Sequence, residues 1–130
     1  MTETMPRIEH VNLTVTNLER SFAFYQALLG FAIRWQGTAV AETGQVRAWH
    51  VGNDATYIAM FEAERVGTAP SDYGVAGFNH VCFEVDDLVV YRARLAVLGV
   101  TPHLEPTYSP GKRLYVYDPD GIEIELVTYR

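Results

Sequence analysis

The sequence predicts an α+β fold in which two βαβββ modules form one cupped mixed sheet. The first observation is a repeat, because residues 10–18 (HVNLTVTNL) recur as residues 80–88 (HVCFEVDDL). The second is that an alternating apolar segment in each copy precedes apolar residues at helical spacing. The third is the length of 130 residues, which suits one domain.

The first module is expected at about residues 8–62 and begins with a strand, in which Val11, Leu13 and Val15 alternate with polar residues. A helix follows, with Thr16 and Glu19 as a capping box and Gly30 as its left-handed exit. Its apolar stripe is Leu18, Phe22, Tyr25 and Leu29. Three further strands are predicted at about residues 32–36, 45–51 and 56–62.

A linker at about residues 65–76 leads to the second module at about 77–128, which repeats this order. Its helix is capped by Asp86 or Asp87 and ends at Gly99. Strands are expected at about residues 101–104, 112–117 and 122–128, with a turn at 118–121 (DPDG) and a loop at 107–111 that is a candidate lid.

Charge and composition exclude several classes of partner. Ten basic residues against sixteen acidic ones give a net charge of -6, which argues against nucleic acid. No segment has the roughly 20 apolar residues of a membrane span, and the N-terminus does not resemble a secretory signal. A single cysteine, Cys82, cannot form an intrachain disulfide, so we expect a cytoplasmic location.

The alternation of the strands predicts which side chains share a face. Val11 and its apolar neighbours face the helix, so His10 faces the other way, as do His80 and Glu125 in the later strands. Two imidazoles and a carboxylate suit a divalent metal with open coordination positions. From the residues alone, ordinary structural roles for these side chains remain an alternative.

The segments 10–15 (HVNLTV), 79–81 (NHV) and 117–126 (YDPDGIEIEL) resemble the vicinal oxygen chelate superfamily. This superfamily contains glyoxalase I, extradiol dioxygenases, fosfomycin-resistance transferases and bleomycin-resistance proteins. The resemblance covers roughly residues 8–127 and implies paired βαβββ modules with metal ligands at His10, His80 and Glu125. Ala59 stands where glyoxalase I-like members carry a fourth ligand, so that reaction is disfavoured.

The resemblance implies Fe²⁺ or Mn²⁺, with Ni²⁺ or Zn²⁺ as alternatives, and a small substrate with two neighbouring oxygens. Our first expectation is a metal-dependent enzyme, either an extradiol-type dioxygenase or a lyase or isomerase. Tyr115 supports the dioxygenase, because it precedes Glu125 at the spacing those enzymes use. The alternatives are a metal-free drug-binding protein and a metal-dependent thiol transferase of the fosfomycin-resistance type. The resemblance implies a homodimer, and in some members module one of one chain pairs with module two of the other. In that arrangement His10 would join His80 and Glu125 of the partner chain.

Further side chains are expected around the substrate. Tyr115 and Glu125 are the candidate catalytic residues, and Arg113 suits a carboxylate or phosphate. His103 is expected at the surface. The candidate substrate-binding residues are Arg113, Lys112, Asn12, His50, Tyr57 and Cys82.

Overall fold

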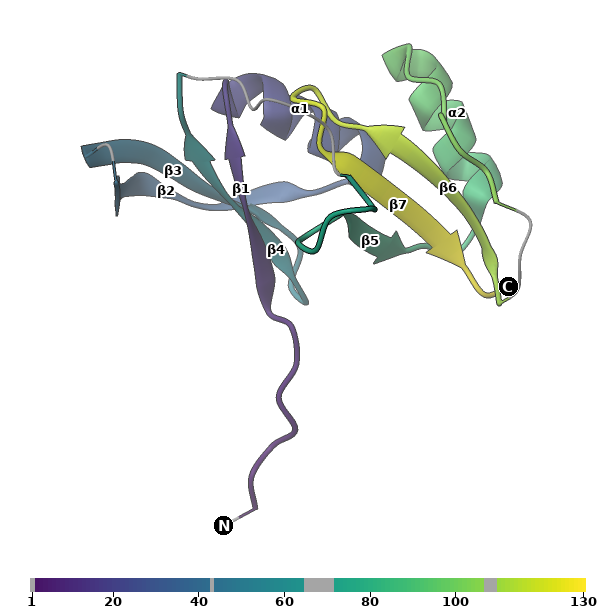
Figure 1. Ribbon diagram of the computed structural model, residues 1–130, viewed down its shortest axis with the longest axis horizontal. Helices are drawn as coiled ribbons and strands as arrows, with labels where there is room; N and C mark the ends of the chain where they lie inside the picture. The colour runs from purple at the N-terminus through teal and green to yellow at the C-terminus, as the bar shows by residue number, and fades with distance from the viewer. Residues whose placement is uncertain (1, 43, 65–71, 107–109) are drawn as a thin grey trace.

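The computed structural model describes residues 2–42, 44–64, 72–106 and 110–130, and its strands form two sheets (Figure 1). Module one contains β1 (His10–Val15), α1 (Leu18–Leu29), β2 (Ala32–Ala41), β3 (Gly44–Gly52) and β4 (Tyr57–Glu62). Module two contains β5 (Val81–Glu84), α2 (Leu88–Leu98), β6 (Lys112–Tyr117) and β7 (Glu123–Thr128). The prediction of an α+β fold with two βαβββ-like modules is confirmed.

The two sheets have the same topology at their centres. The first has the order β1-β4-β3-β2 and the second the order β5-β7-β6. In each, the first strand of the module pairs in parallel with the last, and the last pairs antiparallel with the strand before it. The register places Ala59 between Asn12 and His50, just as Glu125 lies between Cys82 and Tyr115. Ala59 and Glu125 are therefore equivalent positions of the repeat.

The helix-facing sides of the strands supply the core. In β1 the side chains of Leu13 and Val15 are buried, whereas His10, Asn12 and Thr14 are exposed, as the alternation predicts. Phe31 and Phe83 meet edge to face at 5.7 Å, which joins the two modules in one apolar cluster. The cluster of buried residues draws on both helices and both sheets.

Both helices end as the sequence predicts, but the start of α1 differs. Gly30 and Gly99 have φ values of 71° and 72°, the left-handed exit that glycine adopts without strain. Asp87 caps α2, whereas Asn17 rather than Thr16 caps α1 by accepting a hydrogen bond from the Arg20 amide. The prediction of Thr16 as the cap was wrong because Asp120 binds its hydroxyl. No helix in the described part of the chain is long and apolar enough to cross a membrane.

Two strand predictions also needed correction. The segment 101–104 is not a strand and makes a single bridge, from Leu104 to Tyr115. The strand predicted at 32–36 extends to Ala41, because β3 continues to pair with it as far as Gly44. Most of the predicted linker (residues 65–71), and residues 107–109 of the candidate lid, lie outside the described residues.

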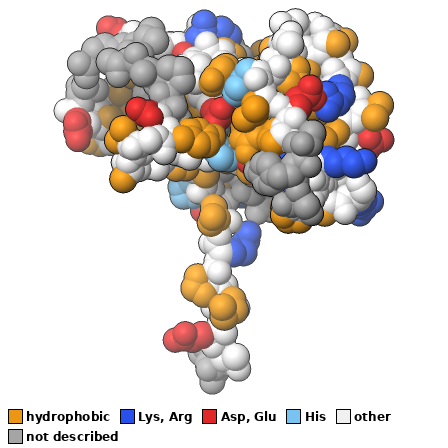
Figure 2. Space-filling model, turned by 45° about the vertical axis from the view of Figure 1, so that its right-hand side comes forward, with side chains coloured by type: hydrophobic (Ala, Val, Ile, Leu, Met, Phe, Trp, Pro, Cys, Tyr) orange, Lys and Arg blue, Asp and Glu red, His pale blue; other side chains and the backbone are white. Residues whose placement is uncertain are grey.

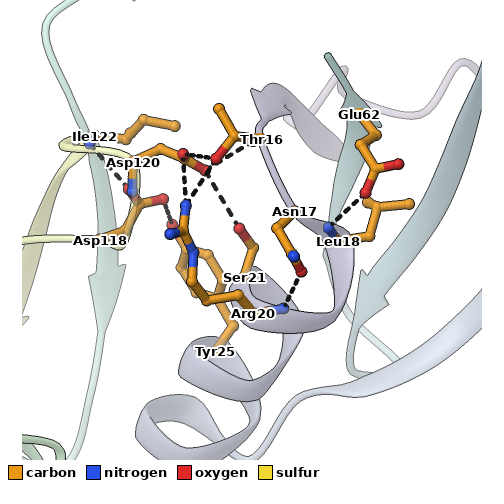
Figure 3. Close-up of polar contacts among 10 residues, drawn as sticks. All are labelled: Thr16, Asn17, Leu18, Arg20, Ser21, Tyr25, Glu62, Asp118, Asp120 and Ile122. Atoms are coloured by element: carbon orange, nitrogen blue, oxygen red, sulfur yellow. Dashed lines mark hydrogen bonds and ion pairs between the residues drawn. The ribbon is translucent and has the colours of Figure 1, made fainter. Parts of the chain in front are cut away.

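A polar joint connects the start of α1 to the turn before β7 (Figure 3). The Thr16 amide and hydroxyl both donate to the Asp120 carboxylate, at 3.1 and 2.5 Å, and the Arg20 guanidinium pairs with it at 3.0 Å. Further along α1, the Tyr25 hydroxyl donates to Asp118 at 2.8 Å. Burial raises the pKa of Asp118 above its ordinary value, although backbone amides and Tyr25 hydrogen-bond to the carboxylate. The joint fixes the modules to each other on their helix side.

Candidate metal centre

His80 and Glu125 meet on the face of the second sheet that is turned away from α2. His80 directly precedes β5, and β5 pairs with β7 so that Cys82 lies beside Glu125. The His80 Nε2 lies 2.8 Å from Glu125 Oε1, with 21% and 6% of the two side chains exposed. This contact needs a shared proton, and a divalent cation that bound the same two atoms would replace that proton.

Arg113 and Tyr115 flank this pair from β6. The Arg113 guanidinium lies 3.1 Å from the second oxygen of Glu125 and also donates to the Pro110 carbonyl. Tyr115 is buried in register with Glu125, and its ring meets the His80 ring edge to face at 5.3 Å. Two predicted residues thus lie beside the pair, but the Arg113 guanidinium already binds Glu125 rather than pointing to open solvent.

A second layer of polar side chains supports His80. Glu123 is 7% exposed, and its carboxylate accepts from the Tyr73 hydroxyl while lying 2.8 Å from His103 Nε2. Burial raises the pKa of Glu123, but the hydrogen bonds from Tyr73 and His103 outweigh it and leave this pKa lowered. The Tyr73 hydroxyl also lies 3.0 Å from His80 Nδ1. His103 lies at the surface, as the sequence predicted, and it also binds this buried carboxylate.

The first sheet carries a row of stacked rings on the equivalent face. His10 stacks on Tyr57 at 4.8 Å, and His50 stacks on the same tyrosine at 4.5 Å. Burial and the nearby charges of His10 and Arg34 lower the pKa of His50, which favours its neutral form. Figure 2 shows histidine side chains (pale blue) at the surface among hydrophobic and acidic side chains. His50 thus shares a face with His10, while Trp49 packs against the core.

One chain does not complete the predicted triad. His10 and His80 both line a cavity of about 600 Å³ between the modules, but His10 Nδ1 binds Glu9 at 2.9 Å. Among the described residues, no three His, Cys, Asp or Glu side chains are placed to hold a metal ion. The structure therefore brings His80 and Glu125 together and leaves His10 on the other sheet.

The hydrogen-bonded spacing of the His80–Glu125 pair is compatible with two neighbouring ligands of one cation. Two ligands about 2.1 Å from a metal and at right angles lie about 3.0 Å apart. This value is close to the 2.8 Å between His80 Nε2 and Glu125 Oε1. Two of the three predicted donors thus already have the spacing of metal ligands.

The other predicted residues divide between the two faces. Cys82 lies next to Glu125, and although the residue is exposed, partial desolvation and the nearby Glu125 charge raise the pKa of its thiol to about 12. An unreactive thiol fits a pocket wall rather than a nucleophile. Asn12 lies beside Ala59 in the first sheet. Lys112 is exposed at the start of β6, and it lines a cavity near the start of α2 that Arg113 also lines.

Sequence reasoning missed Glu123 and Tyr73. Glu123 shares the alternation of Glu125, so the strand pattern already placed it on the ligand face and gave a signal that could have found it. Tyr73 lies in the predicted linker, where no periodic pattern constrains the direction of a side chain.

Comparisons with known proteins agree with this architecture. A family model described as Glyoxalase/Bleomycin resistance protein/Dioxygenase superfamily matches residues 7–126. Glutathione transferase FosA of Serratia marcescens is 28% identical over 123 residues, which cover 92% of this chain and 78% of that protein. A glyoxylase/bleomycin resistance protein/dioxygenase domain from Frankia sp. EAN1pec superposes with a TM-score of 0.79, at 25% identity and with 98% and 94% of the chains covered.

Another solved structure with a similar fold holds a bound metal. A mutant of the fosfomycin resistance protein FosX from Listeria monocytogenes has a TM-score of 0.70 and 20% identity, covering 95% and 90% of the two chains. That structure holds Mn(II) and 1S,2S-dihydroxypropylphosphonic acid. From the family model, which spans nearly all of its length, this chain belongs to the Glyoxalase/Bleomycin resistance protein/Dioxygenase superfamily.

Proposed function

We propose that this protein is a divalent-metal-dependent enzyme that acts on a small substrate with two neighbouring oxygens. The observation that carries the proposal is the 2.8 Å contact between His80 Nε2 and Glu125 Oε1 on the face of the second sheet that is turned away from α2. Burying a carboxylate is costly without partners, and Glu125 has two in His80 and Arg113. The Mn(II) held by the FosX structure favours Mn²⁺ or Fe²⁺ as the ion.

A bound cation supplies a Lewis acid for the two substrate oxygens. Tyr115 lies next to both His80 and Glu125, where its hydroxyl suits hydrogen bonding to an oxygen that gains negative charge. Arg113 holds the second oxygen of Glu125, so it orients the carboxylate for binding. Burial and the nearby charges of His10 and Arg34 lower the pKa of His50, which favours the neutral imidazole that a proton acceptor needs.

We further propose that the third ligand, His10, comes from a second copy of the chain. The two sheets of one chain are joined on their helix side by Tyr25 and Asp118, and His10 forms no ligand group with Glu125 among the described residues. Large apolar side chains next to the ligand faces remain exposed in one chain, including Trp35 and Phe78 at 44% and 69%. Pairing module one of one copy with module two of another would cover such surface.

Metal binding by mixed variants tests both parts of the proposal. Protein reconstituted with Mn²⁺ under anaerobic conditions is expected to bind one ion per chain, and His10→Ala and His80→Ala are each expected to bind none. In a mixed dimer, one site regains all three ligands. Unfolding and refolding the two variants together at equal amounts should therefore restore about a quarter of the wild-type sites.

The outcomes separate the two parts. Wild-type protein that binds no metal refutes the metal-dependent enzyme. If His10→Ala retains full affinity, His10 is not a ligand. If the mixture restores no sites although the wild type binds metal, the ligands come from one chain and the shared site is refuted.

Besides a lyase or isomerase reaction, two reactions at the same centre have specific support. The first is oxygen-dependent cleavage of a diol, which Tyr115 next to Glu125 supports. The second is addition of a thiol to an epoxide, which the likeness to glutathione transferase FosA supports. Oxygen uptake with catechols identifies the first, and glutathione consumption with an epoxide substrate identifies the second. Metal-loaded protein with neither activity, but with tight binding of a drug-like ligand in the absence of metal, would favour the drug-binding alternative.

A further inference from the structure

We infer that Glu123 and Tyr73 are positioning residues that fix the ring of His80, so that its Nε2 faces the metal side. The inference rests on the proposed metal centre, but it concerns a pair of side chains outside the ligand set. Neither residue belongs to the predicted triad. Both lie near His80 Nδ1, on the side of the ring away from Glu125.

The contacts form a chain from His80 to the buried carboxylate. His80 Nδ1 lies 3.0 Å from the Tyr73 hydroxyl, which donates to Glu123 Oε1. The Tyr73 and His80 rings are nearly parallel, with 8° between their planes and 6.0 Å between their centres. His103 holds the second oxygen of Glu123 at 2.8 Å. Two partners, Tyr73 and His103, thus hold the Glu123 carboxylate in place, and Tyr73 connects it to His80.

The donors and acceptors in the hydrogen bonds from His80 through Tyr73 to Glu123 determine how the His80 ring is oriented. The ionised carboxylate of Glu123 can only accept, so the single hydroxyl proton of Tyr73 must point to it. The Tyr73 oxygen then accepts from His80, which requires a proton on Nδ1. In the metal-free protein Nε2 carries the proton shared with Glu125, and a cation that replaced this proton would meet the Nε2 lone pair of a ring held with its other proton on Nδ1.

Module one contains the same three groups around its own histidine. His10 Nδ1 lies 2.9 Å from Glu9 Oε1, and the Tyr57 hydroxyl donates to the same oxygen at 3.1 Å. The Tyr57 ring stacks on His10, as the Tyr73 ring does on His80. The residues come from different positions of the repeat, so sequence duplication alone does not explain the match. Both repeat-mate histidines have a tyrosine and a glutamate near Nδ1, which leaves Nε2 as the ligand atom in each.

The position of Glu123 also requires an explanation that packing does not give. It is a buried carboxylate on the ligand face of β7, two residues before Glu125. A charge so placed is costly unless it is hydrogen-bonded, and an apolar residue would fill the same space without that cost. Carboxylates that orient metal-binding histidines occupy this kind of place in metal sites, and their loss weakens metal binding by about 10- to 100-fold.

The test compares Tyr73→Phe and Glu123→Gln with Tyr117→Phe as the matched control. Phenylalanine at position 73 keeps the ring and removes only the hydroxyl. Tyr117 stacks on His103, the outer partner of Glu123, so Tyr117→Phe removes a hydroxyl from the same neighbourhood and leaves Tyr73, Glu123 and His80 themselves unchanged. Mn²⁺ affinity, followed by the electron paramagnetic resonance signal of free Mn²⁺, is expected to fall about tenfold in Tyr73→Phe and Glu123→Gln and to stay unchanged in the control.

A second measurement does not depend on metal. Nitrogen-15 NMR of the His80 ring in metal-free protein should show a proton on Nδ1 in the wild type and in Tyr117→Phe. In Tyr73→Phe the Nδ1 proton loses its acceptor, so the signal should move toward that of an unprotonated Nδ1. If Tyr73→Phe does not fold, Glu123→Gln tests the same series of hydrogen bonds at the carboxylate.

The possible results distinguish this inference from the proposed function. If the wild type binds no Mn²⁺, the proposed function fails, and NMR alone decides whether Tyr73 orients His80. If the wild type binds Mn²⁺ and both variants bind it equally well, the positioning role is overturned while the metal centre stands. An unprotonated His80 Nδ1 in the wild type also overturns it.

Discussion

Replacing Tyr25 with phenylalanine should reveal how strongly the joint between the modules stabilises the fold. The Tyr25 hydroxyl donates to Asp118 Oδ2 at 2.8 Å, with 0% of Tyr25 and 5% of Asp118 exposed. Asp118 Oδ1 keeps two amide donors, from Asp120 and Ile122, at 2.8 and 2.9 Å. Tyr25→Phe therefore leaves one carboxylate oxygen buried without its hydroxyl partner.

The expected loss follows from the value of a hydrogen bond to a buried charged group. Such bonds contribute about 1.5–3 kcal/mol, and the ring itself is retained, so we expect the free energy of unfolding to fall by about 2 kcal/mol. With a urea dependence of about 1.5 kcal/mol/M, the midpoint of unfolding should fall by about 1.3 M. The measurement is urea unfolding of metal-free protein with a chelator present, because a bound metal would shift the equilibrium.

Tyr129→Phe is the matched control, since Tyr129 is 59% exposed. It should change the free energy of unfolding by less than about 0.5 kcal/mol. A loss for Tyr25→Phe that is no larger than the control would refute the reasoning. It would mean that water or another side chain replaces the hydroxyl at Asp118.

Three further predictions concern other parts of the molecule. Hydrogen bonds from Arg47 lower the pKa values of Glu62 and Glu19 below 4.5. The two ionised carboxylates therefore stabilise the fold above pH 4.5, and this stabilisation is lost as the pH falls through their lowered pKa values. In Arg47→Met, the free energy of unfolding should decrease less steeply between about pH 5 and 3 than in the wild type. Ala59→Glu places a carboxylate at the buried position equivalent to Glu125 and should lower the melting temperature of metal-free protein, while added Mn²⁺ should raise it by more than in the wild type. Gly30→Ala should cost about 1 kcal/mol in urea unfolding, because φ at that position is 71°, and an unchanged midpoint would contradict this.

The sequence predicted the elements whose residues repeat or alternate. The two copies that begin at His10 and His80 indicated the order of the elements, and the alternation in β7 placed Glu125 opposite the helix side. The register then confirmed that Ala59 and Glu125 are equivalent. These features are local or come from duplication, so they can be read without knowing how the modules pack.

The remaining features depend on contacts between distant segments. Thr16 has the pattern of a helix cap, but Asp120 binds its hydroxyl across the joint, and Asn17 caps the helix instead. Residues in irregular segments, such as Tyr73 and His103, have no periodicity that shows where they point. The relative placement of the two sheets is a property of the whole chain, so alternation could not tell whether His10 joins His80 within one copy.

The joint at Asp120 also bears on how the chain opens. Because the amide and hydroxyl of Thr16 bind a carboxylate in the turn before β7, detaching α1 from its sheet also releases one end of the strand that carries Glu125. The duplicated halves should therefore exchange amide hydrogens as a single cooperative unit. A chain built from two similar parts would then have no stable half-open form.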